Sequence, residues 1–242
     1  MRVLVISDIH ANLVAFETVL EEAQDQWDII WCLGDLVGYG PRPNECVALL
    51  REHEHISLSG NHDWAALDKL DLDDFNEEAQ IAISWTREAM SEETREYLDA
   101  LPPKRIVDNF TLAHASPRGP VWEYIMDYET ALANFAHFET PVCLVGHTHI
   151  PVLLAKKGAD DLAVLEPTYQ ETIYLEDTRV IINPGSVGQP RDSDPRAAYA
   201  LLDTEQLTWE FYRVVYPIEQ TQEQIRAAGL PPPLAARLAY GW

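Results

Sequence analysis

Apolar runs alternate with polar segments along the first sixty residues, and their spacing switches between strand and helix. Arg2–Ser7 predicts a buried strand, and Asn12 then precedes apolar positions with helical spacing at Leu13, Phe16, Val19, Leu20 and Ala23. Further strands are predicted at Asp28–Leu33 and Ile56–Ser59, with a helix at Pro43–Glu52 between them. This strand–helix–strand order predicts βαβ units and a parallel sheet.

The rest of the chain begins with an acidic helical segment at residues 62–100 and then becomes rich in strands. Strands are predicted at Phe110–Ala115, Pro141–Val145, Val152–Ala155, Gln170–Leu175, Val180–Asn183, Ala198–Asp203 and Leu207–Val215. Helices are predicted at Asp127–His137 and Ile218–Ala228, Lys156–Thr168 is expected to be a loop or ragged hairpin, and Pro231–Pro233 introduces a tail. The pattern predicts one α/β domain over residues 1–242, in which two sheets pack face to face with helices outside. A helical, proline-containing tail is expected from about residue 217.

Polar fragments follow several of the predicted strands. They are Asp8-Ile9-His10, Gly34-Asp35, Gly60-Asn61-His62-Asp63, His114 and Gly146-His147-Thr148-His149. The carboxyl ends of parallel strands meet at one edge of a sheet, so these fragments are expected to converge. Five of the eight histidines lie in them, and carboxylate, amide and imidazole groups together suit divalent transition metals.

Two of these fragments carry donors at positions i and i+2. In extended backbone such side chains point the same way, so Asp8 with His10, and His147 with His149, are each expected to serve one site. The glycines before Asp35, Asn61 and His147 are expected to allow tight turns and a close approach of the backbone.

Composition narrows the possible partners and the compartment. The chain has 17 basic and 40 acidic residues, a net charge of −23, which disfavours a long nucleic acid or an anionic membrane as partner. A small phosphate substrate remains possible, because bound cations reverse the sign of the charge locally. The three cysteines, Cys32, Cys46 and Cys143, form no C-x-x-C pair, so a disulfide framework is not expected and a reducing cytoplasm fits. The apolar start is too short for a signal peptide, and no stretch approaches the ~20 apolar residues of a membrane span.

The five fragments, taken in order, resemble the motif series of the calcineurin-like metallophosphoesterase superfamily, in its small single-domain prokaryotic branch. That series is D-x-H, G-D, G-N-H-D/E, H and G-H-x-H, and the segment Asn183–Gly188 is similar to the family's N-P-G-S segment. The resemblance spans roughly residues 1–215. It implies a four-layer αββα sandwich with two mixed sheets.

The resemblance also implies roles for individual residues. One divalent metal would be held by Asp8, His10, Asp35 and His149, and the second by Asp35, Asn61, His114 and His147. A hydroxide bridging the two ions (Mn, Fe, Zn, Ni or Co) would attack phosphorus, and His62 would protonate the departing oxygen or at least stabilise it. Asp63 either steers His62 or orders the turn into the next helix.

Other polar and aromatic residues leave two interpretations open. Arg118 and Arg191 either bind a substrate phosphate or pair with surface carboxylates. Trp122 and Tyr124 either contact a base or pack within the fold, and Tyr39 and Asn44 follow Asp35 closely enough to border the site. The function expected is a metal-dependent phosphoesterase, in particular a phosphodiesterase acting on a small phosphate ester or nucleotide. The alternatives are a dinucleoside polyphosphate hydrolase, a Ser/Thr phosphoprotein phosphatase and a non-catalytic, metal-binding interaction module.

Overall fold

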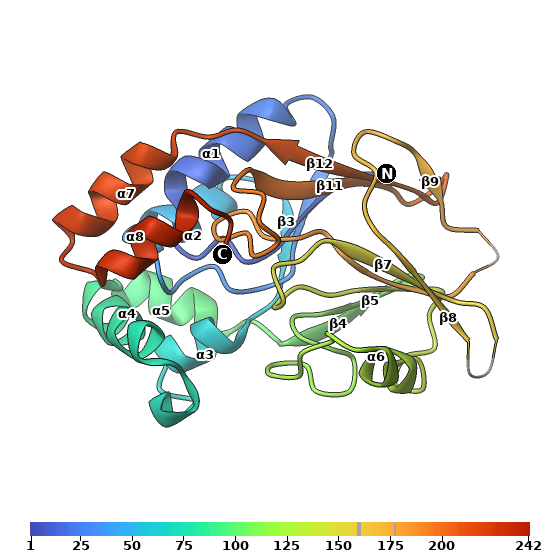
Figure 1. Ribbon diagram of the computed structural model, residues 1–242, viewed down its shortest axis with the longest axis horizontal. Coiled ribbons are helices and arrows are strands. Elements are labelled where there is room, and N and C mark those ends of the chain that lie inside the picture. The colour runs from blue at the N-terminus through green and yellow to red at the C-terminus, as the bar shows by residue number, and fades with distance from the viewer. Residues whose placement is uncertain (159–160, 177) are drawn as a thin grey trace.

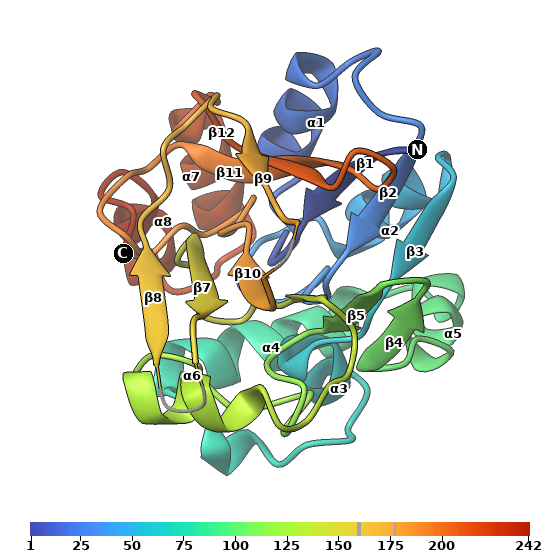
Figure 2. The same ribbon diagram turned by 90° about the vertical axis from the view of Figure 1, so that its right-hand side faces the viewer.

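Two mixed six-stranded sheets pack face to face in the computed structural model, which describes residues 1–158, 161–176 and 178–242 (Figure 1). The first sheet has the order β3-β2-β1-β11-β12-β9 and consists of β3 (His55–Ser57), β2 (Ile29–Cys32), β1 (Arg2–Ile6), β11 (Ala197–Asp203), β12 (Thr208–Val214) and β9 (Ile173–Tyr174). The second sheet has the order β4-β5-β6-β10-β7-β8 and consists of β4 (Lys104–Val107), β5 (Phe110–Ala113), β6 (Val142–Leu144), β10 (Val180–Asn183), β7 (Val152–Lys156) and β8 (Leu162–Leu165). In Figure 2 the first sheet lies above the second.

Each sheet contains a parallel part that directs its strand ends toward the same region. β1, β2 and β3 are parallel to one another, and β5, β6 and β10 are parallel in the second sheet. The inner faces of both sheets share one apolar core, in which Trp31 of β2 meets Phe110 of β5 with ring centroids 5.3 Å apart. The carboxyl ends of both parallel sets therefore open toward one seam between the sheets.

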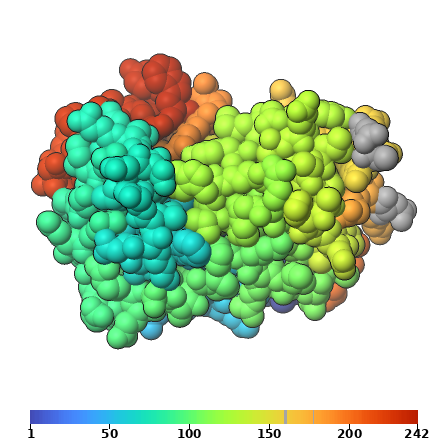
Figure 3. Space-filling view, turned by 90° about the horizontal axis from the view of Figure 1, so that it is seen from below, coloured from blue at the N-terminus to red at the C-terminus, as the bar shows by residue number. Residues whose placement is uncertain are grey.

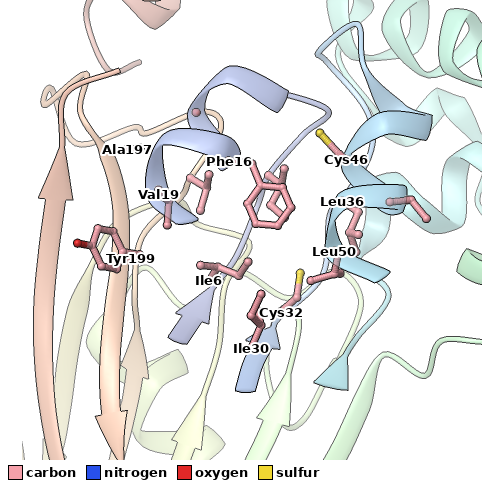
Figure 4. Close-up of a cluster of buried hydrophobic side chains, with 14 of the residues drawn as sticks. Ile6, Phe16, Val19, Ile30, Cys32, Leu36, Cys46, Leu50, Ala197 and Tyr199 are labelled. Atoms are coloured by element: carbon pink, nitrogen blue, oxygen red, sulfur yellow. The ribbon is translucent and has the colours of Figure 1, made fainter. Parts of the chain in front are cut away.

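Helices cover the outer faces and complete the four layers. They are α1 (Leu13–Glu22), α2 (Pro43–Arg51), α3 (Asn61–Ala66), α4 (Glu77–Ala89), α5 (Glu92–Asp99), α6 (Tyr128–Asn134), α7 (Ile218–Ala227) and α8 (Pro232–Leu238), with a 3₁₀ turn at Leu72–Asp74. Phe16 and Val19 of α1 pack on Ile6 and Tyr199 at the outer face of the first sheet (Figure 4). α6 packs through Phe135 on the outer face of the second sheet. The predicted αββα arrangement is confirmed.

Local sequence signals account for most of the observed elements. Asn12 caps α1 as predicted, because its side-chain oxygen accepts a hydrogen bond from the Ala15 amide at 3.2 Å. The same side chain donates to the Gly188 carbonyl at 2.9 Å, so it also connects the first helix to a loop of the second half. Among the described residues, no helix has the length and apolarity needed to cross a membrane.

The sequence analysis missed one strand and left two other elements without bounds. β4 has the pattern Lys-Arg-Ile-Val with exposed residues in the middle, so it lacks the apolar run of a buried strand. β8 pairs with β7, which confirms the hairpin among the two interpretations considered for Lys156–Thr168; residues 159–160 lie outside the described residues. α8 lies within the helical, proline-containing tail that was expected, and it begins at Pro232 because proline is well tolerated in the first turn of a helix. The strand expected at Gln170–Leu175 is reduced to the two residues of β9.

We expect the contact between α1 and the first sheet to contribute strongly to stability. Phe16 is fully buried, so Phe16→Ala should lower the free energy of unfolding by about 3–5 kcal/mol through lost burial and a cavity. Ile81 on α4 is 48% exposed, and Ile81→Ala should change it by less than about 1 kcal/mol. Urea unfolding followed by circular dichroism measures both values, and equal losses in the two variants would contradict the packing described.

Candidate metal centre

The polar fragments predicted from sequence meet at the seam between the two sheets. Asp8 and His10 follow β1, Asp35 follows β2, and Asn61 begins α3 after β3. From the second sheet, His114 follows β5, and His147 and His149 follow β6. All seven side chains are buried, with at most 2% of their surface exposed. The strand ends thus concentrate two carboxylates, one amide and four imidazoles in the interior.

The backbone that presents these side chains is not extended. Five of the seven residues have left-handed φ angles between 49° and 64°, namely Asp8, His10, Asp35, His147 and His149. Non-glycine residues adopt this region at an energetic cost and do so mainly where function requires it. The i, i+2 argument from extended backbone was therefore wrong for His147 and His149, which turn toward different groups of donor atoms.

Two glycines allow the loops to approach one another closely. A Cβ atom at Gly60 would lie 2.0 Å from Asp35 Oδ1, and one at Gly146 would lie 1.9 Å from Ser7 Oγ. Any side chain at these positions would force the neighbouring strand ends apart. The predicted close approach before Asn61 and His147 is confirmed.

The first group of donor atoms contains Asp8, His10 and His149. His149 Nε2 lies 3.4 Å from Asp8 Oδ1 and 3.1 Å from His10 Nε2, and His10 Nε2 lies 3.9 Å from Asp8 Oδ1. Asp35 Oδ2 is 3.6 Å from His10 Nε2, which brings this oxygen to the edge of the first group.

The second group contains Asp35, His114, His147 and Asn61. His114 Nε2 lies 3.4 Å from Asp35 Oδ2 and 3.1 Å from Asn61 Oδ1. One ring nitrogen of His147 is within 4.8 Å of the donor atoms of Asp35 and His114. Asp35 Oδ2 therefore stands between the two groups, as the resemblance to metallophosphoesterases implied for a shared ligand.

Hydrogen bonds at the far side of the rings set the chemical state of three histidines. The Nδ1 atoms of His10, His114 and His149 contact the carbonyl oxygens of Val37, Leu33 and Gln189 at 3.2, 2.9 and 2.5 Å. A carbonyl only accepts, so each Nδ1 carries the proton and, in the neutral ring, Nε2 presents a lone pair to the centre. Metal-binding histidines are oriented in this way.

The centre is short of positive charge and of hydrogen-bond donors, which is what a cation site requires. Asp8 Oδ1, Asp35 Oδ2 and His147 Nε2 are buried without a hydrogen-bond partner among the described residues. The neutral His10 and His149 rings direct two lone pairs at each other across 3.1 Å, a contact that divalent cations make favourable. The residues present therefore fit a divalent metal centre.

The pKa shifts of three of the four imidazoles agree with this interpretation. Burial holds the pKa values of His10, His147 and His149 well below the ordinary value, so these rings are neutral. Burial likewise raises the pKa of Asp8 to about 7. Burial opposes ionisation of Asp35 and protonation of His114 too, but the attraction between these two groups outweighs it: the pKa of Asp35 is lowered, and the pKa of His114 is raised to about 9.

His62 and Asp63 occupy the first turn of α3 beside the donor groups. A ring nitrogen of His62 lies within 4.8 Å of the donor atoms of His10 and Asp35, and burial lowers the pKa of His62 to about 4. The carboxylate of Asp63 accepts hydrogen bonds from the amides of Gly60 at 2.9 Å and Val37 at 3.1 Å. Asp63 therefore orders the turn into α3, which is one of the two roles considered for it.

Comparison with known proteins identifies the family. The model of the calcineurin-like phosphoesterase superfamily domain matches residues 1–207. The chain belongs to this superfamily. It is therefore a hydrolase that acts on phosphoric ester bonds.

Several relatives share most of their length with this phosphoesterase. The uncharacterized protein MJ0912 of Methanocaldococcus jannaschii is 39% identical over 251 residues, covering 99% of this chain and 98% of the relative. Phosphodiesterase YfcE of Escherichia coli is 28% identical over 221 residues, covering 86% and 90%. The crystal structure of a metallophosphoesterase from Sphaerobacter thermophilus is 49% identical, with a TM-score of 0.92 and coverage of 100% and 99%.

The two arginines considered for substrate binding have different surroundings in this phosphoesterase. Arg118 Nε donates to Glu123 Oε1 at 2.8 Å, and the pair is completed by a second contact from Nη2. Burial would raise the pKa of Glu123, but hydrogen bonds from Arg118, Ser116 and Asn134 lower it to about 2. Arg191 donates instead to Gln189 Oε1 at 2.8 Å, and its amide lies 3.4 Å from the His149 carbonyl. Arg191 is thus joined to the centre, whereas Arg118 is already paired with a carboxylate.

Four aromatic side chains, Tyr39, Phe75, Trp122 and Tyr124, form an aromatic collar beside the centre. The rings of Tyr39 and Phe75 lie 4.3 and 5.2 Å from that of His62, and the ring of Tyr124 lies 3.9 Å from that of His147. The rings of Phe75 and Trp122, 4.7 Å apart, join the segment at residues 60–90 to the segment at residues 115–140. These two segments lie side by side on the face shown in Figure 3. The acidic helical segment thus contributes one buried aromatic side chain, Phe75, to the surroundings of the centre.

An apolar cavity of about 200 Å³ lies next to the collar. Its lining includes Ile125, Met126, Thr148, Ile150 and Val164. Thr148 lies between His147 and His149 in the sequence. One residue of the cavity wall therefore belongs to the loop that carries two of the proposed metal ligands. Asn44, also considered for the border, donates instead to the Ala89 carbonyl at 2.8 Å.

Sequence reasoning missed two contributions to the site. The Gln189 carbonyl orients His149. Every residue has a backbone carbonyl, so the sequence does not indicate which one contacts the ring. Arg237 of α8 lies over the Tyr39 ring at 5.9 Å, and it follows the last recognised motif by many residues. No spacing rule links it to the centre.

We expect Asp35 to determine how much metal the protein binds. Asp35→Asn removes one of the two carboxylate charges of the centre, so bound Mn²⁺ per chain should fall at least about tenfold at micromolar metal. Asp74→Asn, at an exposed carboxylate, should bind as much metal as the wild type. Elemental analysis after gel filtration measures the difference, and full metal content in Asp35→Asn would exclude Asp35 as a shared ligand.

Proposed function

We propose that this protein is a metal-dependent phosphodiesterase that hydrolyses a small phosphate ester or nucleotide. The observation that carries the proposal is the position of Asp35 Oδ2, which lies 3.6 Å from His10 Nε2 and 3.4 Å from His114 Nε2 without a hydrogen-bond donor. One buried carboxylate oxygen is thus placed between the ring nitrogens of two donor groups. A pair of divalent metal ions satisfies this arrangement, and the family supports their use.

The two donor groups supply the ligands for these ions. Asp8, His10 and His149 would hold one ion and Asn61, His114 and His147 the other, with Asp35 shared. When bound, such ions lower the pKa of water and neutralise charge on the phosphate. Mn, Fe, Zn, Ni or Co would suit the mixed oxygen and nitrogen donors.

The residues around the ions would orient the substrate and supply a proton. The Arg191 guanidinium is held by Gln189 beside His149 and would bind a phosphate oxygen. The His62 ring would protonate the departing oxygen from its imidazolium form, or stabilise that oxygen with a hydrogen bond from the N–H of the neutral ring. The aromatic collar would exclude water from one side of the phosphate, and its partly exposed members Trp122 and Tyr124 would contact the organic group.

The other functions considered receive different degrees of support. Arg118 is neutralised by Glu123, which leaves few free arginines near the centre for a phosphorylated protein. Family membership favours an enzyme over a non-catalytic interaction module. A small substrate and a cytoplasmic location are consistent with the acidic surface and with three buried, unpaired cysteines.

Hydrolysis of bis(p-nitrophenyl) phosphate tests the proposed function directly. The purified protein should release p-nitrophenol with Mn²⁺, lose at least about 100-fold of its rate after chelation, and recover on adding metal back. The absorbance of p-nitrophenol gives the rate. Activity that persists in a chelator and an Asp35→Asn variant as active as the wild type would each refute metal dependence.

The role of His62 is expected to depend on the leaving group. An alkoxide leaves poorly without a proton, so His62→Ala should reduce kcat by about 10²–10⁴-fold for an alkyl ester and much less for a p-nitrophenyl ester. Metal content should remain at the wild-type level. His137→Ala, at an exposed histidine, provides the matched control. An equal loss for both esters would remove His62 as the proton donor.

A further inference from the structure

Two arginines approach the same tyrosine ring beside the metal centre. The Cζ atoms of Arg191 and Arg237 lie 5.8 and 5.9 Å from the ring centroid of Tyr39. The Tyr39 ring in turn packs against His10 at 4.8 Å and His62 at 4.3 Å. Both guanidinium groups therefore contact a tyrosine ring that itself packs against His10 and His62, the residues proposed to bind metal and to act on the departing oxygen.

Neither arginine forms an ion pair with an Asp or Glu side chain in the part of the chain that the structure describes, although Arg237 Nε donates a hydrogen bond to the backbone oxygen of Trp242. Arg118, Arg196 and Arg213 all form ion pairs within 4.0 Å, as expected in a chain with 40 acidic residues, but no such pair involves Arg191 or Arg237. Arg191 donates from Nη2 to Gln189 Oε1 and to the Tyr39 hydroxyl, at 2.8 and 3.4 Å. Its Nε is buried without an acceptor, so this guanidinium retains an unused donor.

The two positive charges also act on each other. Burial and the charge of Arg191 lower the pKa of Arg237, although Tyr39 and Glu78 oppose the change. Two half-buried guanidinium groups at one tyrosine ring, neither in an ion pair with a carboxylate side chain, repel each other, and an anion that contacts both converts this repulsion into charge-assisted hydrogen bonds.

The positions of the two arginines differ in a way that suggests separate tasks. Arg191 is attached to the centre through its backbone contact with the His149 carbonyl, whereas Arg237 reaches Tyr39 from α8. Leu234 and Leu238 of α8 belong to the same apolar cluster as Tyr39, which holds the helix in place. Figure 1 shows α8 and the C-terminus over the loops that connect the strands. α8 lies beyond residues 1–207, so the superfamily model does not supply Arg237.

We infer that Arg237, together with Arg191, forms a second anion site that binds the phosphate adjacent to the one held at the metal centre. The substrate class would then be a nucleotide or related ester that carries two or more linked phosphates. This inference rests on the proposed function and extends it. Glu78 influences Arg237 but lies outside ion-pair distance, and Arg237 Nε donates to the Trp242 oxygen. Among the described residues, Nη1 and Nη2 of Arg237 donate no hydrogen bond, so these two groups are available to the substrate.

Calorimetry with the full-length, Mn²⁺-loaded protein tests the second anion site without turnover. The probes are AMP and the methylene-bridged analogue of ADP, which differ by one phosphate, with Mn²⁺ in excess of the nucleotide. The wild type should bind the ADP analogue about tenfold more tightly than AMP, and Arg237→Ala should remove most of this preference. Arg237→Lys keeps the positive charge and the aliphatic part of the side chain but loses the planar guanidinium that can donate two hydrogen bonds to one phosphate. It should therefore retain part of the preference.

Arg226→Ala is the matched control, because Arg226 is an exposed arginine on the neighbouring helix α7. It should leave both affinities unchanged, and melting temperatures establish that each variant is folded. Equal affinity of the wild type for AMP and the ADP analogue would overturn the inference. An Arg237→Ala variant that loses affinity for AMP and for the ADP analogue by the same factor would also overturn it. If the proposed function itself were wrong, the wild type would hydrolyse no phosphate ester under any divalent cation, a result independent of the binding ratio.

Discussion

A buried concentration of hydrogen-bond acceptors is the constraint on which the rest of this structure depends. Asp8 and Asp35 place carboxylate oxygens in the interior without donors, and the neutral rings around them turn lone pairs in the same direction. An interior of this kind is unfavourable by itself, because unpaired charges and acceptors lose their hydration. Cations reverse the balance, so the energetic penalty in the free protein and the affinity for metal have the same origin.

Both sheets contribute loops that hold these acceptors. Loops of the first sheet contribute Asp8, His10, Asp35 and Asn61, and loops of the second contribute His114, His147 and His149. The large apolar core between the sheets keeps the loops at a fixed separation. Backbone carbonyls of Val37, Leu33 and Gln189 fix the ring orientations, so the side chains are positioned before any ligand binds.

The sequence predicted the layers and the convergence of the motifs because apolar runs end at polar residues with βαβ spacing. It did not predict how the donors are directed. Left-handed backbone at His147 and His149 sends them to different donor groups, and such φ angles depend on tertiary contacts rather than on local preference. β4 was missed because its middle residues are exposed, and Arg237 because only the packing of α8 on Tyr39 brings it near the site. For Asp63 the two roles could be separated only by the hydrogen bonds that its carboxylate accepts.

The order of strands in the first sheet has a consequence for how the protein matures. β1, which precedes the first metal-binding fragment, lies between β2 and β11, so its pairing is incomplete until Ala197–Asp203 arrives. The Asp8 carbonyl also accepts hydrogen bonds from Ser186 at 2.8 Å and Gly188 at 3.0 Å. A nascent chain that ends after His149 therefore contains every proposed ligand but lacks the strand and loop that hold the first of them. The loop that carries Asp8 and His10 is therefore held in place only after residues 186–203 have folded against it.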